Sequence, residues 1–264
     1  MNRHQFWGFL PSPGTPPQAG ELIRVEDAAQ VHYWQRVRRL SPGQTGGLIL
    51  GQAPSLEGWH ARFKTIENGS ACFELLTPLP QPAHRPSITL ALALLKQPAW
   101  EATLDTATAL GVTQIQPVIS AHCVAQWPAA GADQEKKLSR WQAIIQAAAV
   151  QSERWQTPAL LAPLTLQQLV VNPTALGQTF SGQAFSGQAF MVALERSAGA
   201  IPLLNALQSP KKAYTLLIGP EGGWSSAERA LFSHPPWQPV TLGETILTAP
   251  LASLYALSIL NAAG

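Results

Sequence analysis

The chain has 264 residues, of which 46% are hydrophobic and 12% charged, and its formal net charge is +2. This apolar content excludes an intrinsically disordered chain and is enough for one small and one medium-sized domain with real cores. The net charge is modest for a nucleic-acid-binding protein, so the distribution of charge is more informative than its total.

The N-terminal third predicts a small β-rich domain over residues 1–76. Short alternating runs at residues 47–50 and 59–66 are typical of strands in a small barrel. Residues 1–85 carry eight basic and six acidic side chains, so the whole positive excess lies here. Arg36, Arg38 and Arg39 are the best candidates for phosphate contacts, although an ordinary solvated surface explains such a group equally well.

Residues 77–87 predict a stiff linker, because four prolines occur within residues 77–86. After this segment, predicted strands and helices alternate over residues 88–264. Such alternation is typical of an α/β domain with a mostly parallel sheet.

The most informative segment is residues 214–229. An uncharged, aliphatic run ends at Ile218 and predicts a strand covered on both faces. Gly219, Gly222 and Gly223 follow with Pro220 between them, and glycines allow positive φ and close approach of a ligand to the backbone. Ser225 and Glu228 then have the spacing of a capping box, which predicts the start of a helix.

A second glycine loop follows at residues 240–247. A short apolar strand ends at Gly243, 24 positions after Gly219, and an uncharged segment completes the chain. Either loop alone is equally well explained as a tight connection. The G-x-G-x-x-G pattern of a dinucleotide site is absent, which disfavours an oxidoreductase with a nucleotide cofactor. The loops instead offer apolar walls and main-chain hydrogen-bonding groups to a ligand.

The order of these features resembles the cofactor-binding end of SPOUT RNA methyltransferases, and most closely the bacterial family that methylates N3 of a uridine in small-subunit ribosomal RNA. The resemblance extends upstream to residues 88–96, 107–118, 135–141 and 147–154, and more weakly to His32 and residues 37–43. It implies an α/β fold with a parallel sheet and a C-terminal trefoil knot, preceded by a PUA-like β-barrel. Only the family likeness supports the knot, because true knots are rare.

The resemblance also implies an enzyme with S-adenosylmethionine as its cofactor. That cofactor would lie against Leu194, Ile218, Gly219, Pro220, Glu221, Gly222, Leu242, Gly243, Ile246 and Leu247. The residues expected to contact RNA are Arg24, Arg36, Arg38, Arg39, Gln151, Ser152 and Arg154.

Arg154 and Glu221 are the candidate catalytic residues. Arg154 would anchor a phosphate or the edge of the target base. Glu221 is the nearest general base by motif, but it could equally accept main-chain N–H groups at the turn. The cofactor's sulfonium makes the methyl group electrophilic, so the protein mainly aligns donor and acceptor.

Several departures from the family pattern fall on the substrate side. Residues 246–252 replace the usual I-L-R-T-E-T-A, and Thr245 replaces an arginine. Losing one charge-assisted contact typically costs ~1.5 to 3 kcal/mol. A catalytically weakened paralogue that binds RNA or ribosomal particles is therefore the alternative function.

Other residue types predict no further chemistry. Cys72 and Cys123 are expected to be small core residues in a reducing cytoplasm, with no metal-ligand spacing. His122 and Cys123 are expected to point to opposite faces of a strand, which argues against a nucleophile and base pair. The proline-rich first 18 residues predict no secretory signal, and the polar residues within 247–264 argue against a membrane span.

The last helix predicts a homodimer. Apolar residues surround almost the whole circumference of residues 249–263, and a helix that is apolar on all sides must be buried on all sides. A single domain cannot cover it, so an isologous contact is expected.

Overall fold

The computed structural model divides into two compact units, each described by itself below. The first comprises Met1–Ala83 with Val150–Gln156, and the second His84–Ala149 with Thr157–Gly264. The described residues are 4–263, except 13, 53–54, 129–130, 173–186, 196 and 198.

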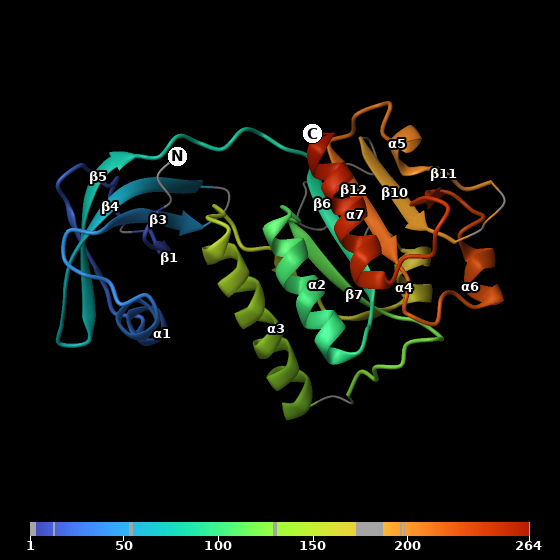
Figure 1. Cartoon of the computed structure of the whole chain (residues 1–264), viewed down its shortest axis with the longest axis horizontal. Coiled ribbons are helices and arrows are strands. Elements are labelled where there is room, and N and C mark those ends of the chain that lie inside the picture. The colour runs from blue at the N-terminus through green and yellow to red at the C-terminus, as the bar shows by residue number, and fades with distance from the viewer. Residues whose placement is uncertain are drawn as a thin grey trace. The chain divides into compact units, whose positions relative to one another are not determined.

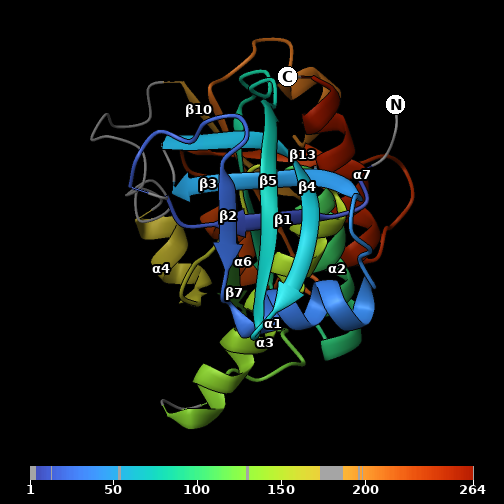
Figure 2. The ribbon, with the colours of Figure 1, turned by 90° about the vertical axis from the view of Figure 1, so that its left-hand side faces the viewer.

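The described part of the first unit contains a five-stranded sheet in the order β1-β3-β4-β5-β2. Its strands are β1 (Trp7–Leu10), β2 (Leu22–Val25), β3 (Thr45–Gln52), β4 (Ser55–Glu67) and β5 (Ser70–Pro78). β1 pairs parallel to β3, and the other neighbours pair antiparallel. Figure 2 faces this sheet, with α1 at one end.

Buried and partly exposed residues alternate along the strands, and the buried ones form the core of the first unit. In β5, Ala71, Phe73 and Leu75 are fully buried, while the residues between them are partly exposed. Phe73 packs edge-on against Trp34, with ring centroids 4.8 Å apart. Trp34 belongs to η1 (Tyr33–Val37), a π-helical turn that continues α1 (Ala28–His32). The predicted β-rich character is therefore correct, whereas closure into a PUA-like barrel stays a prediction.

The described part of the second unit contains a parallel eight-stranded sheet. Its order is β11-β13-β10-β12-β6-β7-β8, with β9 paired to β7. The strands are β6 (Ser87–Ala93), β7 (Gln114–Ile119), β8 (Ala159–Leu160), β9 (Leu164–Thr165), β10 (Gln188–Ala193), β11 (Ile201–Pro202), β12 (Ala213–Ile218) and β13 (Trp237–Thr241). The predicted α/β class with a parallel sheet is confirmed.

Helices cover both faces of this sheet. They are α2 (Gln97–Ala109), α3 (Ala132–Gln151), α4 (Leu166–Val171), α5 (Leu203–Ala206), α6 (Ser226–Leu231) and α7 (Ala249–Ala262). Leu90 and Leu92 of β6 join the cluster made with α2, α3 and α7, while Ala91 and Ala93 join the cluster made with α4 and α6. Figure 1 shows α2 and α7 on one face and α4 and α6 behind it. Successive side chains of β6 therefore point to opposite faces of the sheet and belong to two separate hydrophobic clusters.

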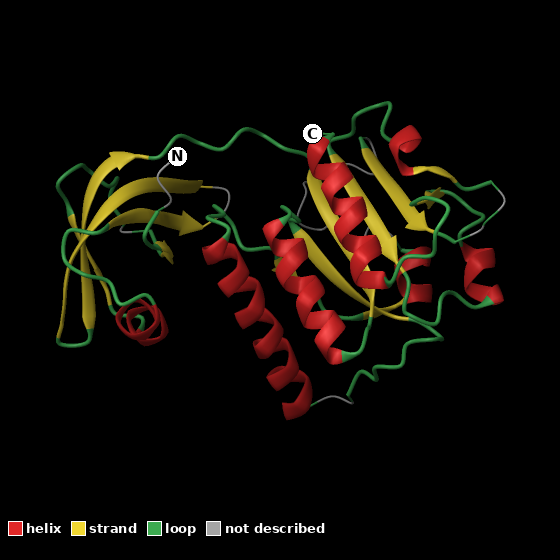
Figure 3. Cartoon of the chain, viewed as in Figure 1, coloured by secondary structure: helices red, strands yellow, loops and turns green. Residues whose placement is uncertain are grey.

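The division of the chain differs from the predicted domains 1–76 and 88–264. β5 runs to Pro78, and Figure 3 shows loop from there to β6. Val150–Gln156 packs with the first unit. There the Trp7 indole N–H donates to the Arg154 carbonyl at 2.8 Å, and His4 Nδ1 lies 2.8 Å from a Glu153 carboxylate oxygen. Since these contacts join residues about 150 positions apart, local sequence patterns did not reveal them.

Candidate functional site

A cavity of about 220 Å³ lies at the carboxyl ends of β10, β12 and β13, beside the start of α7. In parallel sheets, the loops at these ends are where ligands usually bind. Nine of the ten residues predicted to hold a cofactor line this cavity, and only Gly222 does not. The nine are Leu194, Ile218, Gly219, Pro220, Glu221, Leu242, Gly243, Ile246 and Leu247.

The glycines of the first loop differ from the expectation in their backbone conformation. Positive φ occurs at Gly223 (67°) and at Gly243 (125°) in the second loop, but not at Gly219 or Gly222. A Cβ on Gly219 would lie 2.9 Å from Cε2 of Trp224. Gly219 is therefore required because the indole packs directly on the backbone, and the expectation of positive φ at Gly219 and Gly222 was wrong.

Gly222 packs on the turn that follows β7. A Cβ there would lie 2.9 Å from the Cβ of His122. His122 Nδ1 lies 3.1 Å from the Gly222 oxygen and 3.2 Å from the Gly223 oxygen, and since carbonyls only accept, Nδ1 carries the proton. His122 and Cys123 are in a turn, so the expected strand there was wrong.

The predicted capping box is present and extends to the same turn. Ser225 is the N-cap of α6, and its side chain accepts from the Glu228 main-chain N–H. One carboxylate oxygen of Glu228 accepts from the Ser225 main-chain N–H, and the other accepts from that of Ala121, both at 2.8 Å. Glu228 is buried, so a single carboxylate fixes the glycine loop, the helix start and the turn after β7.

Two residues that the sequence did not single out tie the walls together. The Trp224 indole N–H donates to the Ala193 carbonyl at 3.4 Å. The Arg229 guanidinium donates to the carbonyls of Trp224 and Glu195, also at 3.4 Å. Trp224, Arg229 and Glu195 all line the cavity. Trp224 directly precedes the capping box and Arg229 directly follows it, which was an available signal, but tryptophan and arginine have many other roles.

Glu221 also lines the cavity, and its carboxylate has a main-chain partner. One oxygen accepts from the Lys96 N–H at 3.3 Å, which links the glycine loop to the N-cap residue of α2. This contact matches the alternative role considered for Glu221, namely accepting a main-chain N–H at the turn.

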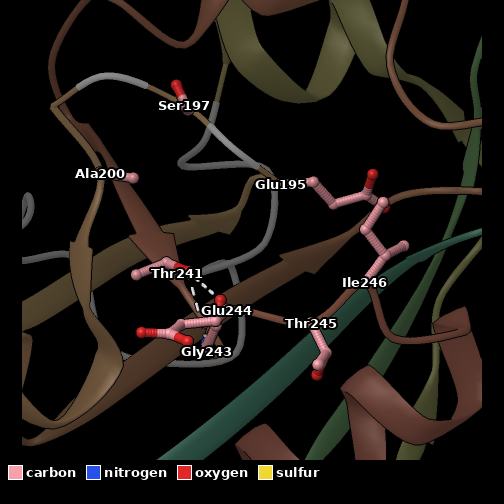
Figure 4. A pocket seen from close by; sticks show the side chains of 8 residues that line it. All are labelled: Glu195, Ser197, Ala200, Thr241, Gly243, Glu244, Thr245 and Ile246. Atoms are coloured by element: carbon pink, nitrogen blue, oxygen red, sulfur yellow. Dashed lines mark hydrogen bonds between the residues drawn. The ribbon is translucent and has the colours of Figure 1, made fainter.

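A second cavity of about 320 Å³ adjoins the first, and Figure 4 shows its walls. It is lined by Glu195, Ser197, Ala200, Thr241, Gly243, Glu244, Thr245 and Ile246. Five of these residues line the first cavity too, so the two cavities are neighbours. Among the described residues, no group of three His, Cys, Asp or Glu could hold a metal ion.

Residues 82–261 match the family model of the RNA methyltransferase domain, which is more than half of the chain. The chain belongs to this family. It is 34% identical over 248 residues to the ribosomal RNA small subunit methyltransferase E of a Synechocystis strain, covering 94% of this chain and 75% of that one. The protein of the same name from Mycobacterium bovis is 30% identical, with 92% and 87% covered.

A solved structure is similar over almost the whole chain. It is the ribosomal RNA small subunit methyltransferase E of Neisseria gonorrhoeae bound to S-adenosyl methionine. The TM-score is 0.76 and the identity 25%, with 97% of this chain and 96% of that chain covered. Both cavities described above lie within the matched RNA methyltransferase domain.

The residues predicted to contact RNA at positions 151, 152 and 154 belong to the first unit. Gln151 ends α3 and is exposed, Ser152 is partly buried, and Arg154 is held through its carbonyl by Trp7. Burial lowers the pKa of Arg154 to about 10. The residue as a whole is partly buried.

The four predicted arginines of the first unit are all exposed. Arg24 is on the edge strand β2, and Arg36 is in η1. Arg38 donates to the Gln5 carbonyl, at 3.2 Å from its Nε. Arg39 has a positive φ of 49°. Arg38 is thus already bonded to the main chain, while Arg24, Arg36 and Arg39 present their side chains at the surface.

None of the helices in the described part of the chain combines the length and apolar character needed to cross a bilayer.

Proposed function

We propose that this chain transfers the methyl group of S-adenosylmethionine to ribosomal RNA of the small subunit. The observation that carries the proposal is the first cavity, in a chain of the RNA methyltransferase domain family, lined by the predicted cofactor residues. Relatives named as small-subunit ribosomal RNA methyltransferases, one of them bound to S-adenosyl methionine, support it. Such an enzyme would work in the cytoplasm.

The walls of the cavity suit this cofactor. Ile218, Leu242 and Leu247 supply apolar surface, and the main chain around Gly219 and Gly243 supplies hydrogen-bonding groups for an adenine edge. When bound, the cofactor supplies an electrophilic methyl group. We propose the ten predicted residues as its binding site, with Gly222 acting from behind the loop. The trefoil knot, which rests on the family likeness, belongs to the same proposal.

We further propose N3 of a uridine as the acceptor atom and Arg24, Arg36, Arg38 and Arg39 with Gln151, Ser152 and Arg154 as RNA contacts. The exposed arginines suit phosphates, because Arg carries a permanent charge and a planar fork of donors. Arg154 and Glu221 stay the candidate catalytic residues. Arg154 is partly buried, and Glu221 would have to exchange its Lys96 partner.

A homodimer is part of the proposal. α7 buries one face against the sheet and α2, whereas Leu251, Leu254 and Tyr255 are 47%, 39% and 44% exposed. Three large apolar side chains on one helix face favour a protein contact, here with a second copy of α7. A stable isologous interface should bury more than ~1,000 Å² in total.

Two measurements test the function. Isothermal titration calorimetry should show binding of S-adenosylmethionine and S-adenosylhomocysteine, and absence of both would refute the enzyme. Mass spectrometry of ribosomal RNA from a deletion strain should then show loss of one 3-methyluridine. An unchanged modification profile together with cofactor binding would favour the alternative, a non-enzymatic RNA- or ribosome-binding factor, as the substitutions at residues 245–252 suggest.

A further inference from the structure

Two tryptophans hold residues 150–156 on the first unit. The Trp7 indole N–H donates to the Arg154 carbonyl at 2.8 Å. The Trp155 indole packs on the backbone of β4, because a Cβ on Gly58 would lie 2.5 Å from Cζ2 of that ring. Both contacts lie within one compact unit of the chain. The segment is therefore a packed part of the first unit rather than a free connection.

Glu153 is the strained point of this segment. Its φ of 53° lies in the left-handed region, which residues other than glycine rarely adopt. Such a conformation persists only where surrounding contacts hold it. The Glu153 carboxylate makes one such contact, because His4 Nδ1 lies 2.8 Å from one of its oxygens. Weakening this contact should therefore favour release of the segment.

His4 contacts a second histidine with its other ring nitrogen. His4 Nε2 lies 3.3 Å from Nδ1 of His60, and the ring centroids are 5.2 Å apart. The strands paired with β4 place a glycine and a threonine opposite His60. Arg62, two residues along β4, is paired with Glu74 at 3.3 Å. These contacts leave His4 as the titrating partner of His60.

The three groups stay bonded with one extra proton but not with two. Since a carboxylate only accepts, His4 carries a proton on Nδ1, and in the neutral pair His60 Nδ1–H donates to His4 Nε2. One further proton makes His4 an imidazolium, which donates to both Glu153 and His60 and turns the first bond into an ion pair. A second further proton sets the N–H groups of two cations against each other, with no acceptor between them.

We propose that His4, His60 and Glu153 form a proton-sensitive latch, which holds residues 150–156 on the first unit and releases them when both histidines are charged. Burial, and then the charge of His4, lower the pKa of His60. The released ring therefore binds a proton more readily than the held one, so acid favours release. The segment carries three of the proposed RNA contacts, and control of their presentation by the latch rests on the proposed function.

Hydrogen exchange tests the latch on the free full-length protein, by mass spectrometry without RNA or cofactor. Dividing the rate of an unstructured peptide by the rate for residues 150–156 at each pH gives the protection of the segment. Since a hydrogen bond is lost, this protection should fall about 2- to 12-fold between about pH 6.5 and pH 5. Protection of β12, in the second unit, should change less than about twofold, which separates local release from global unfolding.

Three variants separate the groups. His60→Gln keeps a side chain that donates and accepts but cannot gain the second charge, so the loss of protection in acid should disappear. Glu153→Gln removes the ion pair and should lower protection at about pH 6, where one extra proton binds the cluster. His84→Gln is the matched control, because it makes the same chemical change at an exposed histidine, and it should keep the wild-type profile.

Two results would overturn the inference. One is equal protection of residues 150–156 at both ends of this pH range in the wild type. The other is a loss of protection in acid that persists in His60→Gln. Either result leaves the proposed function standing, because cofactor binding and RNA methylation are measured separately.

Discussion

Replacing Gly219 with alanine is expected to weaken cofactor binding by displacing the indole of Trp224. The added Cβ would lie 2.9 Å from Cε2, 3.1 Å from Nε1 and 3.2 Å from Cζ2 of that ring. Carbon atoms in contact normally lie ~3.5–4.0 Å apart, so the ring must shift by more than about 0.5 Å. The indole N–H already donates to Ala193 at a long 3.4 Å, and a shift threatens that bond.

The direction of the shift determines the effect on binding. Trp224 packs edge-on against Phe232, a fully buried ring 5.2 Å away, and it also lines the first cavity. Inserting one carbon into a well-packed site typically costs ~1–3 kcal/mol. If the indole relieves the contact by moving into the cavity, the dissociation constant for S-adenosylhomocysteine should rise by about 5- to 150-fold.

A double-mutant cycle with Trp224→Leu isolates this contact. Leucine lacks the three clashing ring atoms, so Gly219→Ala should cost at least ~1 kcal/mol less in binding when made on the Trp224→Leu protein. Gly222→Ala is the control, because its Cβ would meet His122 behind the loop. It should lower thermal stability more than affinity. Wild-type affinity in Gly219→Ala, or strictly additive effects of the two changes, would refute the packing argument.

Glu228 is buried and accepts a hydrogen bond from the Ala121 main-chain N–H, so it should stabilise the fold. Glu228→Gln should lower the free energy of unfolding, measured in urea, by ~1–3 kcal/mol. Unchanged stability would contradict the bonding described. Burial and the neighbouring His4 lower the pKa of His60. The unfolded chain therefore binds this proton more readily, and stability should fall as the pH drops from about 6.5 through the folded pKa; thermal melts of His60→Gln should show a weaker pH dependence. Tyr255→Glu should give monomers in sedimentation velocity, and an unchanged dimer would place the interface elsewhere.

Much of the second unit could be predicted because its signals are local. The strand at β12 follows from an uncharged aliphatic run, and the start of α6 follows from Ser225 and Glu228, whose side chains and main chains bond over one helical turn. The glycine loops were identifiable for a similar reason, since few residues other than glycine allow another group to pack directly on the backbone.

The contacts that give each glycine its purpose were not predictable from the sequence. Gly219 lies only five positions from Trp224, yet nothing in the pattern indicates that the indole folds back onto it. His122 contacts Gly222, and Ala121 donates to Glu228, across about 100 residues of sequence. Such pairings are decided by which strands become neighbours in the sheet, and this depends on the whole chain.

The sequence by itself determined the alternation of strands and helices, the two glycine loops and the likeness to a family of RNA methyltransferases, because each depends on residues close together in the chain. Only the tertiary structure decided that residues 150–156 pack with the first unit and that Glu195 lines both cavities. Arg154 illustrates the difference. Its charge suggested an RNA contact, but the desolvation that lowers its pKa depends on neighbours brought from distant parts of the chain, such as Trp7.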